Sequence, residues 1–213
     1  RKPAMNKFFC MLSVAVALQG CSKPDDQPSK PDTTSAASNQ LVKKTDMPTP
    51  PAPKPSPVSE LLEKQTLAEA VEYLKPKMTD TFNSFPEAAG YLAIWVNQHG
   101  FKWKDLANFE ETRFGKVLKD PDAERGKRIC MAGSIVEIAA DKTAGFTVYH
   151  VGLADNNMRF MRVLAVGSTG ELIAQSPFRF CGVVIGKVGF QNSIGGTTEA
   201  VYAVGVFDLP ENR

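Results

Sequence analysis

The sequence predicts an α+β protein in which N-terminal helices precede a five-stranded β-barrel. Three observations predict it. A polar, proline-rich stretch separates an apolar N-terminus from the rest of the chain. Hydrophobic residues then recur at helical spacing over residues 59–125, and short runs of alternating hydrophobic residues, punctuated by glycine, follow over residues 126–213. With 213 residues, 43% of them hydrophobic, the chain is long enough to bury a core.

The chain begins with a segment typical of an export signal. We expect translation to start at Met5, and an apolar run over residues 8–18 is too short to span a bilayer. The run ends in Leu18-Gln19-Gly20-Cys21, which resembles the lipobox of bacterial lipoproteins. The resemblance implies that residues 1–20 are a signal peptide and that acyl chains are attached to Cys21.

The same resemblance implies an address in the cell envelope, on the periplasmic side of a membrane. Each buried methylene contributes about 0.8 kcal/mol, so two or more acyl chains anchor a protein stably. Ser22 follows the cysteine. By resemblance to enterobacterial sorting, serine at this position favours the outer membrane over the inner one.

Residues 21–58 predict a tether between the lipid and the folded part. They are rich in proline, serine, threonine, aspartate and lysine, and they end in the run Met47–Pro57, which contains six prolines. Almost nothing in the stretch is apolar, so it has no core to join. We therefore expect a disordered spacer.

Helices are expected in residues 59–125. The stretch Thr66–Glu69 has the form of a capping box, and the apolar pattern that follows ends at Pro76. The stretch Ser84–Glu87 predicts a second helix start of the same kind, and Gly100 predicts its end. A third helix is expected between Trp103 and Leu118.

Strands are expected from Gly126 onward. The five predicted strands cover residues 127–138, 146–153, 158–166, 178–188 and 200–207. In the first of them the alternation slips after Ile135, close to Gly133, which predicts a bulge and a bend. The stretch Glu171–Ala174 predicts one helical turn between the third and fourth strands.

This order of elements resembles the OB fold, which has five strands, a long bent first strand and a short helical piece after the third. The stretch Gly126–Ile138 is similar to the opening strand of OB-like domains in small bacterial envelope proteins. The resemblance covers about 40% of the chain. An SH3-like barrel and a five-stranded open sheet are alternatives that fit the same pattern.

The resemblance also implies where a ligand would bind, because OB folds bind ligands across the second and third strands. Here those strands carry Tyr149, His150, Arg159, Phe160 and Arg162. Aromatic rings combined with arginine suit a sugar, a base or an acidic partner. The alternative is that the phenylalanine belongs to the core and the arginines are solvated edge charges.

Cys130 and Cys181 are the two cysteines of the expected folded part. An oxidising envelope favours a disulfide between them. In an OB fold the first and fourth strands are antiparallel neighbours, so the resemblance implies that the two cysteines can face each other. The alternative is two unpaired, inert thiols in apolar strands.

The sequence lacks the residue patterns of common catalytic and metal sites. His99 and His150 are the only histidines of the chain, which excludes a site of three histidines, and no phosphate-cradling loop occurs. We therefore expect a non-catalytic binding or assembly module without a metal or cofactor. Its expected partner, besides the membrane, is an envelope protein or a glycan.

Two other functions are kept as alternatives: an enzyme or enzyme inhibitor that acts on periplasmic polymers, and an oligonucleotide binder. Cleavage before Cys21 would remove Arg1, Lys2 and Lys7. That leaves 22 of the 25 basic side chains against 23 acidic ones, a net charge of −1. The mature chain would therefore lack the basic excess of a non-specific nucleic-acid binder.

Overall fold

The computed structural model describes residues 56–142, 145–192 and 195–213. The expected signal peptide, Cys21 and nearly all of the expected tether lie outside the described residues. The described residues belong to one compact unit with helices and a six-stranded sheet, which confirms the α+β prediction. Within them, no helix is both long enough and apolar enough to cross a membrane.

In the part of the chain that the structure describes, five short α-helices precede the long strands. They are α1 (Pro57–Leu62), α2 (Leu67–Leu74), α3 (Glu87–His99), α4 (Phe114–Lys119) and α5 (Pro121–Glu124), with 3-10 turns at Lys75–Lys77, Trp103–Leu106 and Pro210–Asn212. The predicted capping box is confirmed: Thr66 Oγ1 accepts from the Glu69 N–H at 3.3 Å, and the Glu69 carboxylate accepts from the Thr66 N–H at 3.1 Å.

Two helix starts differ from the prediction. Ser84 does not cap α3, whose N-cap position is Pro86 without a side-chain hydrogen bond. A proline disfavours helical backbone in the residue before it, so α3 begins only at Glu87. Helix α1 was not predicted, and it begins with Ser56 as its cap and Pro57 in its first turn. The folded part therefore starts before the predicted boundary at residue 59.

Of two further helix predictions, one was confirmed in part and one was wrong. The helix expected between Trp103 and Leu118 is present as the short α4, which follows a 3-10 turn. It does not extend further toward Trp103, because Glu111 pairs with Arg128 at the start of the strands. The stretch Glu171–Ala174 is a turn without a helix. It is followed by Gln175 with a left-handed φ of 70°, a conformation that a helix cannot continue.

All five predicted strands are present. The sheet contains β1 (Thr81–Phe82), β2 (Arg128–Asp141), β3 (Val148–Ala154), β4 (Phe160–Ala165), β5 (Pro177–Gln191) and β6 (Thr197–Phe207). The predicted irregularity of the first long strand is confirmed, because the pairing of β2 with β3 shifts between Ile135 and Glu137. The sequence did not predict β1, which has two residues and pairs in parallel with β5.

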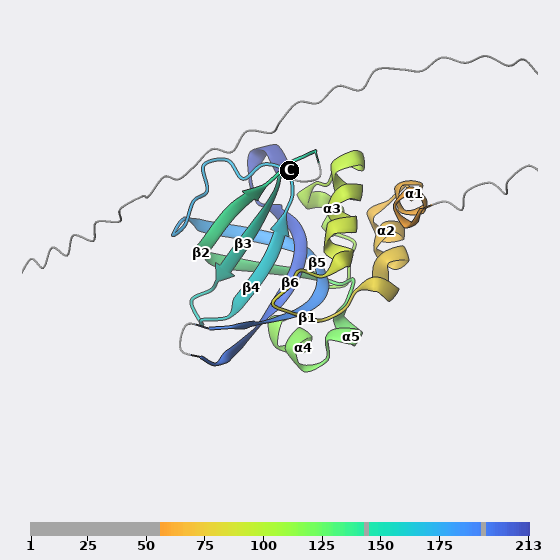
Figure 1. Ribbon diagram of the computed structural model, residues 1–213. Coiled ribbons are helices and arrows are strands. Elements are labelled where there is room, and N and C mark those ends of the chain that lie inside the picture. Colours follow the sequence, from red (N-terminus) through yellow and green to blue (C-terminus); the bar gives the residue numbers. More distant parts are fainter. Residues whose placement is uncertain (1–55, 143–144, 193–194) are drawn as a thin grey trace, which may run out of the picture. The chain divides into compact units, whose positions relative to one another are not determined.

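The strand pairings close into a ring (Figure 1). The sheet order is β1-β5-β2-β3-β4-β6, and β5 pairs with β6 as well as with β2. The strands β2, β3, β4, β6 and β5 thus form a closed cycle, to which β1 adds an edge. The β4–β6 pairing is parallel and the other four pairings of the cycle are antiparallel.

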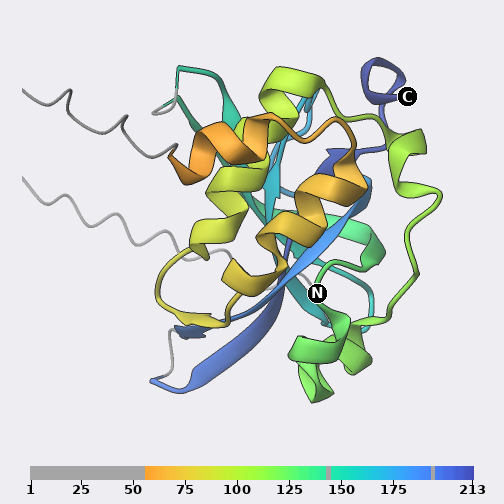
Figure 2. The ribbon, with the colours of Figure 1, turned by 90° about the vertical axis from the view of Figure 1, so that its right-hand side faces the viewer.

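Side chains on the two faces of the strands build two hydrophobic clusters. Along β6, Val201 and Ala203 belong to one cluster, whereas Tyr202 and Val204 belong to the other, as expected for a strand buried on both faces. The first cluster is made mainly of strand residues and fills the ring. The second joins the outer face of the strands to helices α1, α2 and α3, which Figure 2 shows in front of the strands.

The predicted disulfide between Cys130 and Cys181 is present. The two cysteines are direct register partners of the antiparallel β2–β5 pairing. Cys181 is buried and Cys130 is exposed. The disulfide therefore clamps the first and fourth strands of the ring from its surface.

Candidate ligand-binding groove

The structure does not bring the residues of the predicted ligand face together in one site. Tyr149 packs against the cluster that fills the ring, while its neighbour His150 lies on the outer face toward α3. The reason is the alternation of side chains along β3, which points successive residues to opposite faces of the sheet. Only one of these two residues can therefore take part in an outer site.

Arg159 supports the turn between β3 and β4. The Asp155 carboxylate accepts hydrogen bonds from the backbone N–H groups of Asn157 and Arg159, both at 2.9 Å, and from Arg159 Nε at 2.6 Å. Burial disfavours the charge of Asp155, but these hydrogen bonds outweigh it and hold the pKa of Asp155 below its usual value. The guanidinium thus has a local structural partner.

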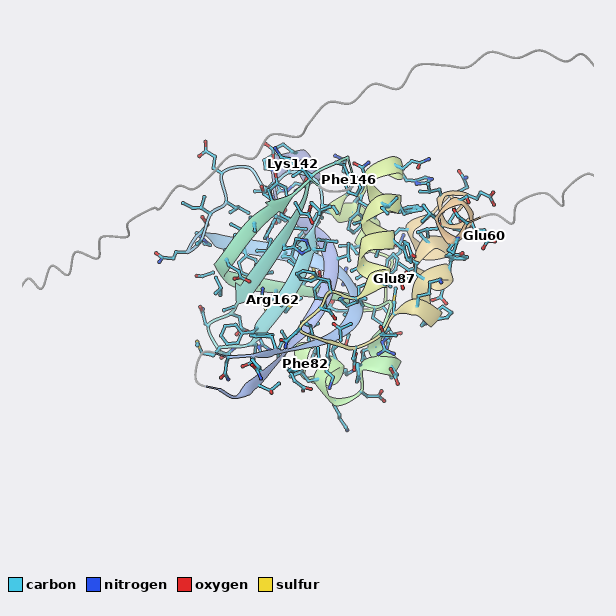
Figure 3. The ribbon with its side chains drawn as sticks, in the orientation of Figure 1. Glu60, Phe82, Glu87, Lys142, Phe146 and Arg162 are labelled. Carbon is cyan, nitrogen blue, oxygen red and sulfur yellow. A yellow bond between two sulfur atoms is a disulfide. The ribbon has the colours of Figure 1, made fainter. Side chains whose placement is uncertain are left out.

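Arg162, which is labelled in Figure 3, lies on the outer face of β4. Its guanidinium pairs with Glu137 of β2. The pair passes over Gly152 of β3, where an added Cβ would approach Glu137 Cγ to 3.0 Å. The guanidinium also lies 4.9 Å from the ring centre of Phe190. Its charge is therefore compensated, and the residue forms one wall of a hollow of about 220 Å³ that includes Phe160.

A larger groove, of about 390 Å³, lies between helix α3 and the outer face of β3, β4 and β6. We call it the α3 groove. Its walls are mainly apolar and come from α3, from the strands and from Phe146. Figure 3 shows Glu87 at one end of α3 and Phe146 beside the other end. The apolar wall residues are Pro86, Ala89, Ala93, Ile94, Val148 and Leu164. This volume is in the range of small-ligand sites, at about 300–1,000 Å³.

Two buried polar atoms at the strand side of the groove have no hydrogen-bond partner among the described residues. They are the hydroxyl of Tyr202 and Nδ1 of His150. Tyr202 is 0% exposed, and burial raises the pKa of its hydroxyl, with the charge of Arg162 acting in the opposite direction. An unpartnered buried hydrogen-bonding group costs about 1–3 kcal/mol of stability, so two of them in one place call for a functional explanation.

Phe85 covers both of these side chains. Its ring centre lies 4.2 Å from that of His150 and 5.9 Å from that of Tyr202, yet Phe85 itself is 54% exposed. On the other side of the imidazole, Nε2 of His150 lies 3.3 Å from Oδ2 of Asp141. A carboxylate only accepts, so this hydrogen bond needs the hydrogen on Nε2 and leaves Nδ1 of the neutral ring as an acceptor.

The residues that complete this groove were missed by the sequence analysis. Phe85 was taken as part of a helix start and Tyr202 as one of several apolar strand residues. Two signals were present: a large aromatic residue directly before a proline at a helix start, and a hydroxyl-bearing ring in the otherwise aliphatic stretch Ala200–Val206. Neither signal shows by itself that the two rings meet.

The chemistry of the groove is that of hydrogen bonding in an apolar setting. Among the described residues, no group of three or more His, Cys, Asp or Glu side chains is placed to hold a metal ion. The groove offers a hydroxyl donor, an imidazole acceptor and apolar walls. This combination selects a ligand by shape, apolarity and one or two hydrogen bonds.

Comparison with known proteins leaves the identity of the chain open. No family model matches it, and no curated protein matches it. Among solved structures, it is similar to the mitochondrial single-stranded DNA-binding protein Rim1 from S. cerevisiae, with 9% identity and a TM-score of 0.28 over 41% of this chain and 97% of that one. A TM-score this low supports neither a shared fold nor a shared function.

Proposed function

We propose that this protein is a lipid-anchored, non-catalytic binding module of the bacterial envelope, and that its ligand binds in the α3 groove. The observation that carries the binding role is the pair of buried, unpartnered polar atoms of Tyr202 and His150 at the base of an apolar groove. Such atoms are stabilised when a ligand supplies the missing hydrogen bonds. The anchor would be Cys21, with the periplasmic face of the outer membrane as the site of action.

We further propose that the closed ring of strands is an OB-type barrel. The order of pairings supports it: the first long strand pairs with the second and the fourth, and the third pairs in parallel with the fifth. The bulge in β2 also fits a bent first strand. The chain departs from the OB pattern in having a turn instead of a helix between the third and fourth strands.

The nucleic-acid alternative is disfavoured by the ion pairs of the two arginines in and next to β4. Arg159 pairs with Asp155, and Arg162 pairs with Glu137. Binding to a phosphate backbone depends on cations that can replace bound counterions. Two arginines that already have carboxylate partners provide little of that attraction.

The lipid anchor is tested by Cys21→Ala. We expect the variant to incorporate no label from a fatty-acid probe and to persist as a precursor that keeps residues 1–20. The physical reason is that the thiol of Cys21 is the group to which the acyl chains would be attached. The measurement is metabolic labelling with an alkyne fatty acid followed by mass spectrometry of the intact protein. Acylation of the variant would contradict the lipoprotein proposal.

The groove is tested by photocrosslinking in intact envelopes. A benzoyl-phenylalanine at position 85 is expected to form a defined adduct, because Phe85 borders the α3 groove. The same group at Ile173, which is 67% exposed on a turn outside the groove, is the control. In a second control, Gly90→Leu places a side chain in the groove, at a position where an added Cβ meets nothing within 4 Å.

The expected result is an adduct at position 85 that is absent at position 173 and that disappears with Gly90→Leu. Gly90 lies within α3, and leucine favours a helix over glycine, so this variant should fold. Equal adducts at positions 85 and 173, or an adduct that Gly90→Leu does not reduce, would exclude the α3 groove as the ligand site.

A further inference from the structure

We infer that the ligand of the α3 groove is an extended peptide. The backbone C=O of one of its residues accepts a hydrogen bond from Tyr202, and the backbone N–H of the same residue donates one to His150. This residue has an apolar side chain that lies in the groove, and a basic residue is next to it. This inference rests on the proposed function, which assigns the groove as the ligand site. It deepens that proposal by naming the chemical class of the ligand.

The hydrogen-bonding groups of the two side chains are complementary. The hydroxyl of Tyr202 can donate, and Nδ1 of His150 accepts when the Nε2 hydrogen is directed to Asp141. The ligand must therefore present an acceptor and a donor. Both side chains project from the outer face of the strands and both lie under the ring of Phe85, so the two groups of the ligand must point to the same side.

An extended peptide has this arrangement. In a strand, the N–H and C=O of one residue point to the same side, which is why a residue can exchange both hydrogen bonds with one partner. A single trans amide, such as the acetamido group of an amino sugar, directs its N–H and C=O to opposite sides. The geometry of the groove therefore favours a peptide over a glycan.

The walls and the rim of the groove define the rest of the ligand. The walls are formed by side chains such as Ala93, Ile94 and Leu164, which favour an apolar side chain and provide no partners for sugar hydroxyls. The charged residues that line the groove are Glu87 and Asp141. Two carboxylates at the rim attract a lysine or arginine next to the apolar residue.

Access to the two buried atoms requires one side-chain movement. Phe85 covers them, but it is half exposed and lies in the short connection between β1 and α3. Changes of side-chain rotamer at binding surfaces are common and leave the backbone in place. The arriving peptide displaces the ring of Phe85 outward and takes over the hydrogen bonds that the closed groove leaves unmade.

The test uses the chain from Ser22 to Arg213, which contains all of the described residues. The probe is the peptide acetyl-Lys-Leu-Lys-amide, and its affinity is measured by isothermal titration calorimetry. A second probe replaces the leucine N–H with an ester oxygen, which removes the donor to His150 and leaves the side chains unchanged. We expect the ester to bind about tenfold more weakly, the size of one lost hydrogen bond.

The matched variants are Tyr202→Phe and Tyr149→Phe, each of which removes one hydroxyl. Tyr202→Phe is expected to weaken the peptide about tenfold while raising the melting temperature of the free protein, because it removes an unpartnered buried group. Tyr149 lies on the face of β3 that points into the ring, away from the groove. Tyr149→Phe is therefore expected to leave the affinity for the peptide unchanged. A merely structural tyrosine would instead lower the melting temperature when its hydroxyl is removed.

Equal affinities for the amide and the ester, or for the parent chain and Tyr202→Phe, would overturn the inference. Binding of tri-N-acetylchitotriose in place of the peptide would overturn it in favour of a glycan. If no peptide binds while crosslinking at position 85 still succeeds, the peptide inference fails and the groove stands as the ligand site. If the crosslink also fails, the proposed function fails with it.

Discussion

Replacing both Cys130 and Cys181 with alanine is expected to lower the free energy of unfolding by about 4 kcal/mol. The disulfide closes a loop with a sequence separation of 51 residues, and the chain-entropy model assigns about 4 kcal/mol to a loop of this length. For a unit of this size the melting temperature should fall by roughly 10 °C. The effect is large because a domain has only about 5–15 kcal/mol in total.

The measurement is urea unfolding of the parent chain with and without a reductant, next to the double variant. Because Cys130 is exposed, the reductant can reach the bond in the folded protein. Reduced parent and double variant should therefore unfold at nearly the same urea concentration. An unfolding midpoint that the reductant does not change, or two free thiols in protein purified without reductant, would contradict the disulfide.

Gly205→Ala is expected to destabilise the protein by about 3 kcal/mol or more, toward the upper end of overpacking effects. An added Cβ at this position would lie 2.1 Å from the carbonyl oxygen of Cys181 and 2.4 Å from Cα of Gly182. Both are backbone atoms of β5, which no side-chain rotation can move away. The substitution therefore forces apart β5 and β6 beside the disulfide, at the pairing that closes the ring.

Gly115→Ala is the matched control, because an added Cβ there meets nothing within 4 Å and the residue lies in helix α4. Alanine is favoured over glycine in a helix by up to about 1 kcal/mol, so this variant should be as stable as the parent or more stable. The measurement is thermal unfolding by circular dichroism. Equal stability of the two alanine variants would show that β5 and β6 are not in close contact at Gly205.

Features with a local cause could be predicted from the sequence. The capping box of Thr66 and Glu69 depends on residues three positions apart, and the five strands follow from a period of two. The bulge in β2 was visible as a slip of that period after Ile135. The disulfide was also predictable, since an antiparallel pairing of the first and fourth strands brings Cys130 and Cys181 opposite each other.

Predictions failed where a neighbouring element or a backbone constraint competes with the local pattern. Ser84 has the right residue type for a cap, but Pro86 delays the start of α3. The stretch before α4 has a helical pattern, but Glu111 pairs with Arg128 instead. A local pattern reports the preference of one segment alone. Whether that segment forms a helix also depends on the distant residues with which it pairs in the folded chain.

The sequence by itself determined the class of the fold, the strands, the cysteine pair and the expectation of an N-terminal lipid anchor, because each is encoded within one segment or by residue type. Only the tertiary structure decided the site. Phe85, His150 and Tyr202 come from the segment before α3, from β3 and from β6, and they meet because the ring closes and α3 packs on its outer face. Whether a polar atom is left without a partner depends on all of its neighbours at once, so no pattern along the chain could reveal it.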